Sequence, residues 1–133
     1  DKSLTRTTPT ELSVARSKLS ATTVGDYALF GGGGRYSTVD AYDKSLTRTT
    51  PTELSVARSK LSATTVGDYA LFGGGGRYST VDAYDKSLTR TTPTELSVAR
   101  SNLSATTVGD YALFGGGSGF NSKTVATVDV YTK

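Results

Sequence analysis

The chain has 133 residues, carries 15 Lys and Arg against 12 Asp and Glu, and contains no Cys, His, Met or Trp. The missing thiols and imidazoles remove the usual ligands of zinc, haem and iron–sulfur centres, as well as the commonest general base. The net charge of +3 is small and its signs are interspersed, which argues against a nucleic-acid partner. No apolar run approaches the ~18 residues needed to span a bilayer, so we predict a soluble chain without a membrane span. Its localisation stays open, with a secreted or cell-surface protein included.

The chain is organised as three tandem repeats. Residues 1–42 and 43–84 are identical, and a third copy over 85–133 matches them as far as Gly117, with Asn102 as the one change. This copy then carries a longer loop over 118–127 before it closes on "VDVYTK". Repeats of about 40 to 50 residues are typical of solenoids and propellers. Their near-identity indicates either recent duplication or deliberate construction.

Each repeat predicts four short strands. "SLTRTTPTEL" (3–12) contains a proline and charges, which suit an outer edge strand. "RSKLSATTV" (16–24) alternates with period two, Gly25-Asp26 suits a tight hairpin turn, and "YALF" suits a buried strand. After the glycines, "STVDAY" alternates again. A helical repeat is disfavoured, because Thr, Val and Tyr dominate and no window offers an amphipathic helix.

The repeat resembles the kelch repeat of β-propellers. "YALFGG", "VDAYD" and "SVAR" stand in the kelch order and spacing, although Thr49 stands where kelch repeats carry a Trp. The resemblance implies that "RSKLSATTV" is innermost in each blade, that "DYALFGG" and "STVDAY" follow, and that "SLTRTTPTEL" is outermost. The predicted fold is therefore all-β: a β-propeller of four-stranded antiparallel kelch-like blades, three per chain. The chain begins on an outer strand and its last blade lacks one.

Three blades are too few to close a ring, because closed propellers typically have four or more. An open wedge exposes apolar blade faces and an unpaired strand edge, which favours association. We therefore expect the partner to be the chain itself, with residues 4–12 pairing with "TVDVY" of the next copy. A homodimer gives six blades and a homotrimer nine, and the dimer is preferred. The alternative is that the chain is a segment of a longer array.

Candidate catalytic and nucleotide-binding motifs are weak. "GGGGRY" does not complete a dinucleotide-binding pattern, and "GSGFNSKT" (117–124) has Ser122 where a P-loop needs glycine. Glu11, Asp26 and Asp40 recur once per repeat, and we interpret them as turn and strand-surface groups. We predict a non-catalytic protein, not an enzyme, with no cofactor and no metal.

The most suggestive groups for binding are arginine–tyrosine pairs beside the glycines and the arginine of "SVAR". Ring closure is expected to gather them on one face with the long third loop, and Arg with Tyr is a composition common in binding hot spots. In the alternative reading, the "SVAR" arginines bond backbone carbonyls and tie blades together. The predicted role is structural or interaction-based, and the alternative is a propeller that binds a glycan, a surface or a protein ligand. The candidate face comprises Arg16, Arg35, Tyr36, Arg58, Arg77, Tyr78, Arg100, Phe120, Asn121 and Lys123.

Overall fold

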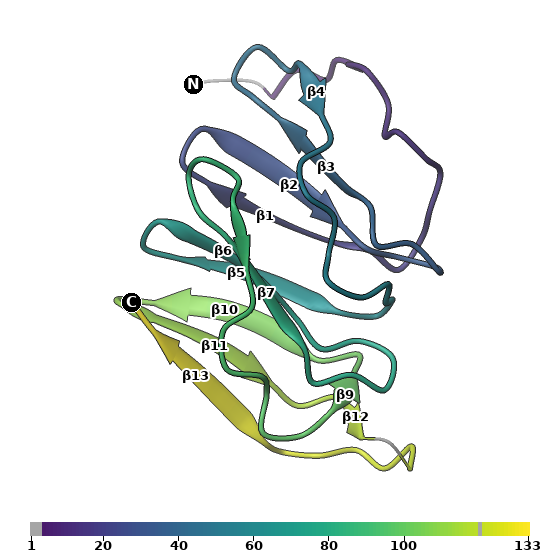
Figure 1. Ribbon diagram of the computed structural model, residues 1–133, viewed down its shortest axis with the longest axis vertical. Helices are drawn as coiled ribbons and strands as arrows, with labels where there is room; N and C mark the ends of the chain where they lie inside the picture. The colour runs from purple at the N-terminus through teal and green to yellow at the C-terminus, as the bar shows by residue number, and fades with distance from the viewer. Residues whose placement is uncertain (1–3, 120) are drawn as a thin grey trace.

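The computed structural model describes residues 4–119 and 121–133. In Figure 1, three β-sheets follow one another along the long axis, from the purple N-terminal end to the yellow C-terminal end. The prediction of an all-β chain built from antiparallel four-stranded sheets is confirmed for the first two of these sheets. Within the described residues, no helix has the length and hydropathy needed to cross a membrane.

The first sheet has the order β1-β2-β3-β4 and the second has the order β5-β6-β7-β8. Their strands are β1 (Ser20–Val24), β2 (Tyr27–Gly31), β3 (Val39–Tyr42), β4 (Arg48–Thr49), β5 (Ser62–Val66), β6 (Tyr69–Gly73), β7 (Val81–Tyr84) and β8 (Arg90–Thr91).

The third sheet has the order β10-β11-β13, and a two-stranded sheet pairs β9 with β12 beside it. These strands are β9 (Arg100–Ser101), β10 (Ser104–Val108), β11 (Tyr111–Gly115), β12 (Ser118–Gly119) and β13 (Val128–Thr132). The third sheet therefore has three strands, with β13 at its edge.

Several turns are formed at glycines whose φ is positive. Gly25, which lies between β1 and β2, has φ +55°, a conformation that glycine adopts without steric cost. Gly33 has φ +101°, and a Cβ built on it would lie 2.7 Å from the carbonyl oxygen of Ser17. The glycines after β2 therefore serve both as turn residues and as points of close backbone approach.

Two predicted strands are shorter than expected. The inner strand begins at Ser20 and not at Arg16, because Lys18 adopts φ +63° and interrupts the extended chain. The outer strand is reduced to Arg48–Thr49, ahead of Pro51. Its first copy has no strand assigned within residues 4–12. Each four-stranded sheet takes its outer strand from the following sequence repeat.

The core lies at the junctions between sheets. β1 lies against β5, and β5 lies against β10. One apolar cluster joins the first and second sheets and another joins the second and third. Phe72 contacts Tyr84 edge-on at 5.9 Å, and both side chains are fully buried. Burying these apolar faces against each other is the main stabilising term for such a stack.

Candidate functional site

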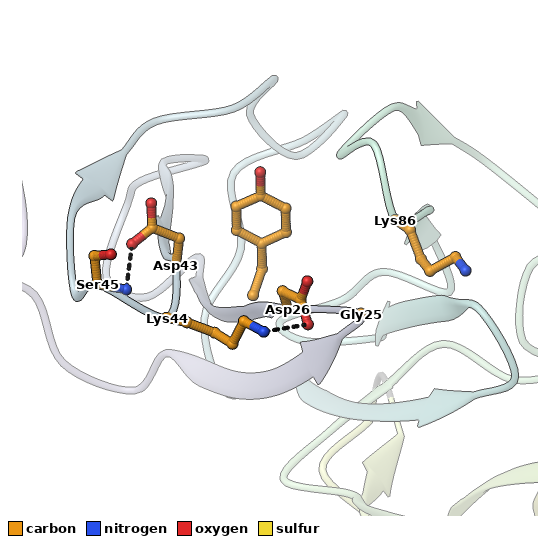
Figure 2. A pocket seen from close by; sticks show the side chains of 7 residues that line it. Gly25, Asp26, Asp43, Lys44, Ser45 and Lys86 are labelled. Atoms are coloured by element: carbon orange, nitrogen blue, oxygen red, sulfur yellow. Dashed lines mark hydrogen bonds and ion pairs between the residues drawn. The ribbon is translucent and has the colours of Figure 1, made fainter.

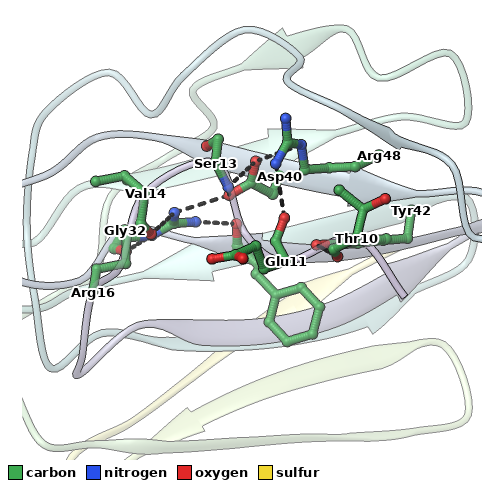
Figure 3. Close-up of polar contacts among 10 residues, drawn as sticks. Thr10, Glu11, Ser13, Val14, Arg16, Gly32, Asp40, Tyr42 and Arg48 are labelled. Atoms are coloured by element: carbon green, nitrogen blue, oxygen red, sulfur yellow. Dashed lines mark hydrogen bonds and ion pairs between the residues drawn. The ribbon is translucent and has the colours of Figure 1, made fainter. Parts of the chain in front are cut away.

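The arginine of "SVAR" lies inside the sheet that follows it in sequence. Arg16 Nε donates to Gly32 O at 2.6 Å and Nη2 donates to Phe30 O at 3.0 Å, while Nη1 donates to Asp40 Oδ2 at 2.9 Å. Figure 3 shows this guanidinium between the turn after β2 and the carboxylate on β3. Asp40 also accepts the backbone N–H of Ser13 at 3.3 Å. The side chains of Arg16 and Asp40 are both 0% exposed.

The same unit recurs in the second sheet, and the third sheet repeats it, within the described residues, without the bond from the arginine Nε to a glycine carbonyl. Arg58 bonds Gly74 O, Phe72 O and Asp82 at 2.6, 2.8 and 2.8 Å. Arg100 bonds Phe114 O at 2.8 Å and Asp129 at 3.0 Å.

The expected place of Arg16, Arg58 and Arg100 on an exposed binding face is therefore wrong, because all three side chains are 0% exposed. Asp40 is likewise not a surface carboxylate, since β3 is buried on both faces. The alternative hypothesis, in which these arginines bond backbone carbonyls, agrees with the observed hydrogen bonds. However, the hydrogen bonds described for their side chains tie together segments of one sheet and do not reach a neighbouring sheet.

The arginine–tyrosine pairs remain accessible. Arg35 and Arg77 are exposed, and Tyr36 and Tyr78 are 38% and 37% exposed. Tyr36 N donates to Gly33 O at 2.9 Å, so the pair sits on a tight turn. The two pairs stand at equivalent positions of the first and second sheets.

The long third loop is partly described. Asn121 and Lys123 are exposed, and Lys123 N donates to the side-chain oxygen of Asn121 at 3.2 Å. Phe120 lies outside the described residues. A polar hollow of about 380 Å³ lies beside this loop, and Arg77 lines it together with Lys60, Asn102 and Ser122. Lys60 and Asn102 were not among the predicted site residues, although Asn102 replaces the lysine of the other repeats.

A second, more charged hollow of about 650 Å³ lies at the hairpin turn that joins β1 and β2. Figure 2 shows Asp26, Asp43, Lys44 and Lys86 around it, with Lys44 Nζ 3.8 Å from Asp26 Oδ1. A Cβ built on Gly25 would lie 3.1 Å from Cγ of Lys86, which comes from the second sheet. This lysine stem therefore covers the hairpin of the preceding sheet.

Close contacts between sheets form a repeated junction. A Cβ built on Gly31 would lie 2.7 Å from the ring of Phe72, and one on Gly73 would lie 2.8 Å from the ring of Phe114. Gly33 N also donates to Arg58 O at 2.9 Å, and Gly75 N donates to Arg100 O at 2.8 Å. A glycine at the end of the second strand thus lets the phenylalanine of the next sheet approach the backbone.

The third sheet carries the same glycines without these contacts. At Gly115, the one described atom within 4 Å of a built Cβ is Cγ2 of Val128, at 3.5 Å. At Gly116 it is Val125 O, at 3.9 Å, and at Gly109 no described atom lies that close. As far as the described residues show, the glycine half of the junction is covered at the first and second sheets and uncovered at the third. We call this surface, defined by Gly109, Gly115 and Gly116, the acceptor face.

Tyr84 on β7 is fully buried, and Tyr131 on the edge strand β13 is half-buried. Burial removes water from the Tyr131 hydroxyl and, together with the negative charge of Asp129, raises its pKa to about 12. Burial and, to a smaller extent, the negative charge of Asp82 raise the pKa of Tyr84 above its usual value. Tyr131 OH donates to Thr94 O at 2.6 Å and Tyr84 OH to Thr52 O at 2.7 Å. These hydroxyls anchor the segment that precedes each inner strand. Among the described residues, no group of three or more carboxylates gathers as a metal site.

No protein-family model and no curated protein matches the chain. Among solved structures, the chain is similar to that of YjhT, with a TM-score of 0.81 and 15% sequence identity over 92% of this chain. The match spans 44% of the YjhT chain, so this protein corresponds to less than half of that neighbour. The likeness supports a β-propeller-like fold, while the kelch resemblance remains a prediction.

Proposed function

We propose that the chain is a non-catalytic structural and interaction module that assembles with copies of itself, head to tail, into a closed propeller. The observation that carries the proposal is the acceptor face on the third sheet. It repeats a junction that is filled twice within the chain. The matching half of the junction is carried by the first sheet of another copy.

The first sheet presents the groups that this junction needs. Phe30 is the repeat of Phe72 and Phe114, which are 0% exposed, yet Phe30 is half-buried. In the proposed contact, Phe30 of the next copy packs on Gly115 as Phe72 packs on Gly31. The second and third sheets bury this face against a neighbouring sheet. The first sheet is therefore expected to bury the same face against another copy.

The edge of the third sheet also supports association. Val128 and Val130 on β13 are 55% and 50% exposed, whereas Val81 and Ala83 at the same places on β7 are 1% and 4% exposed. In the second sheet, β8 pairs with β7 at Ala83 and Tyr84. Residues 6–7 repeat the sequence of β8, so in the proposal they pair with β13 of the neighbouring copy. An exposed apolar edge strand of this kind favours pairing with another chain.

Ring size follows from the number of sheets that close a propeller. Closed propellers typically have four to eight blades. Two copies of this chain supply six blades and three supply nine. We therefore propose a homodimer.

Light scattering of the purified chain tests the proposal. The expected mass is twice the 13.9 kDa of one chain, and three times that mass would indicate the nine-blade trimer. Phe30→Ala should shift the population toward monomer, because it removes the aromatic ring that fills the acceptor face. Tyr36→Ala, at an exposed turn of the same sheet, is the matched control and should keep the wild-type mass. A stable wild-type monomer at micromolar concentration would overturn the proposal.

A ligand-binding module is the second candidate, favoured by the polar hollow that Arg77 shares with Lys60 and Asn102. Hydroxyl, amide and cationic groups around a hollow suit a glycan or an acidic ligand, and repetition of the Arg-Tyr turns would add avidity. Binding on a glycan array that disappears in the double variant Tyr36→Ala, Tyr78→Ala would support this function. A silent array would count against it.

A further inference from the structure

We infer that the apolar groove between the second and third sheets is a socket for Leu4 of a second copy of this chain. The inference deepens the proposed self-assembly and rests on it. The groove has a volume of about 290 Å³, and its apolar wall is formed by Val66, Tyr69, Leu71 and Ala83 of the second sheet. Side chains of β13 and the segment at Thr91 and Pro93 complete it.

The chain contains an internal precedent for this contact. The apolar wall of the groove repeats Val24, Tyr27, Leu29 and Ala41 of the first sheet. Val24, Leu29 and Ala41 belong to the apolar cluster at the junction of the first and second sheets, and both Tyr27 and Leu88 pack against that cluster. Leu88 thus supplies cover at the first junction, from the turn that precedes the outer strand β8.

The second junction lacks the corresponding leucine within the described residues. Lys133 is the repeat of Lys86, which precedes Leu88 by two positions, so the described residues stop short of the equivalent of Leu88. Tyr69 is 45% exposed, whereas its repeat Tyr27 is half-buried. The groove is therefore the counterpart of a covered surface at the other junction.

The other two copies of this leucine are Leu46, which belongs to the first sheet and is 48% exposed, and Leu4, which is fully exposed. Leu4 precedes Arg6 by two residues, as Leu88 precedes Arg90 at the start of β8. When residues 6–7 pair with β13 of a neighbouring copy, Leu4 is brought to the groove beside that strand. The outer segment then carries both a strand and an apolar anchor.

The backbone is strained at Leu88 and Leu46, the copies of this leucine that precede the outer strands β8 and β4. Leu88 has φ +65° and Leu46 has φ +62°, which lie in the left-handed region that is unfavourable for leucine. In the second repeat, Asp85 stabilises the turn by accepting the N–H groups of Ser87 and Thr89 at 2.9 and 3.0 Å. At Leu88 this strained turn projects a leucine that packs against the first apolar cluster, whereas Leu46 at the same turn of the first sheet is 48% exposed.

In the proposal the occupant comes from another copy. Figure 1 shows the purple N-terminal segment beside the first sheet, at one end of the stack, and β13 at the opposite end. The chain's own N-terminal segment is therefore remote from the groove beside β13. A second copy, placed by the proposed junction, carries its Leu4 to this end.

The first test compares Leu4→Asp with Thr8→Asp in the full chain by sedimentation or light scattering over a dilution series. The repeats of Thr8, at Thr50 and Thr92, are exposed, so Thr8→Asp should leave association unchanged. Leu4→Asp places a charge in an apolar groove and should weaken association at least about tenfold. Because Leu4 is exposed in the single chain, circular dichroism should show unchanged folding for both variants.

The second test uses disulfide trapping. Because the chain contains no cysteine, no native thiol competes with the introduced pair. The double variant Leu4→Cys, Tyr69→Cys should form a covalent dimer after mild oxidation. The matched control Leu4→Cys, Tyr111→Cys should not, because Tyr111 is the equivalent exposed residue on the third sheet, away from the groove. Leu88→Cys with Tyr27→Cys should form a disulfide within one chain and confirms that the equivalent positions can be bridged.

The outcomes separate the two proposals. A monomeric wild-type chain overturns the self-assembly and the socket together. A dimeric wild type in which Leu4→Asp associates normally, or in which cross-linking at Tyr69 does not exceed that at Tyr111, overturns only the socket. Weakened association together with selective cross-linking at Tyr69 supports it.

Discussion

Replacing Gly115 or Gly73 with alanine separates the junction inside the chain from the proposed junction between chains. Both residues end the second strand of a sheet, and neither has a positive φ. The strand conformation itself therefore accepts alanine, which alone stabilises by about 0.4–1 kcal/mol through the unfolded chain. The two sites differ in what the new methyl group would meet.

At Gly73 the new Cβ would lie 2.8 Å from a ring carbon of Phe114. That ring is fully buried and is held edge-on against Tyr131 at 5.8 Å, so it has little room to retreat. Overpacking of this kind costs about 1–3 kcal/mol. Gly73→Ala should lower the urea midpoint by on the order of 1 M, given typical denaturant slopes.

At Gly115 the new Cβ would lie 3.5 Å from Val128, an ordinary contact. The stability of the single chain should therefore stay the same or rise slightly. In the assembly, the methyl group would meet Phe30 of the next copy, and association should weaken about ten- to hundredfold per junction. Urea titration measures the first effect, and light scattering over a dilution series measures the second.

The reasoning would be refuted by either of two results. Gly115→Ala that associates as tightly as the wild type would show that Phe30 does not approach this glycine. Gly73→Ala that is as stable as the wild type would show that the close approach of Phe114 carries no structural demand.

Three further predictions concern the chain itself. Asp82→Asn or Arg58→Met should each destabilise by about 3–5 kcal/mol in urea titration, because either leaves a buried partner unpaired; equal stability of these variants and the wild type would contradict the structural role. Stability should fall as pH rises from 10 to 12, because the folded state keeps Tyr131 and Tyr84 protonated while the unfolded state releases those protons. The double variant Tyr84→Phe, Tyr131→Phe should flatten that decline, and a decline of the same slope would point to other groups. Lys60→Asn should stabilise by about 0.5 kcal/mol in thermal unfolding, because φ +62° suits asparagine better than lysine; a loss of stability would argue against a backbone effect.

Sequence by itself determined the all-β class, the hairpin at Gly25 and the approximate positions of the inner strands. Period-two alternation and turn glycines act over a few neighbouring residues, so they can be read locally. The repeat pattern also predicted a third sheet without its own outer strand, and the described residues form three strands there. Lys18 at φ +63° escaped detection, because nothing in its local sequence distinguishes it from a strand residue.

Tertiary structure alone decided what the arginines and glycines do. Arg16 meets Asp40 across 24 positions of sequence, and only the folded sheet reveals that both groups are buried and paired. Gly31 has an extended backbone, so its conformation does not require glycine. Glycine is required there because a Cβ would lie too close to the ring of Phe72 on the next sheet. Burial and close approach depend on residues far apart in the sequence, so a local pattern can locate such residues but cannot show which face of the molecule they serve.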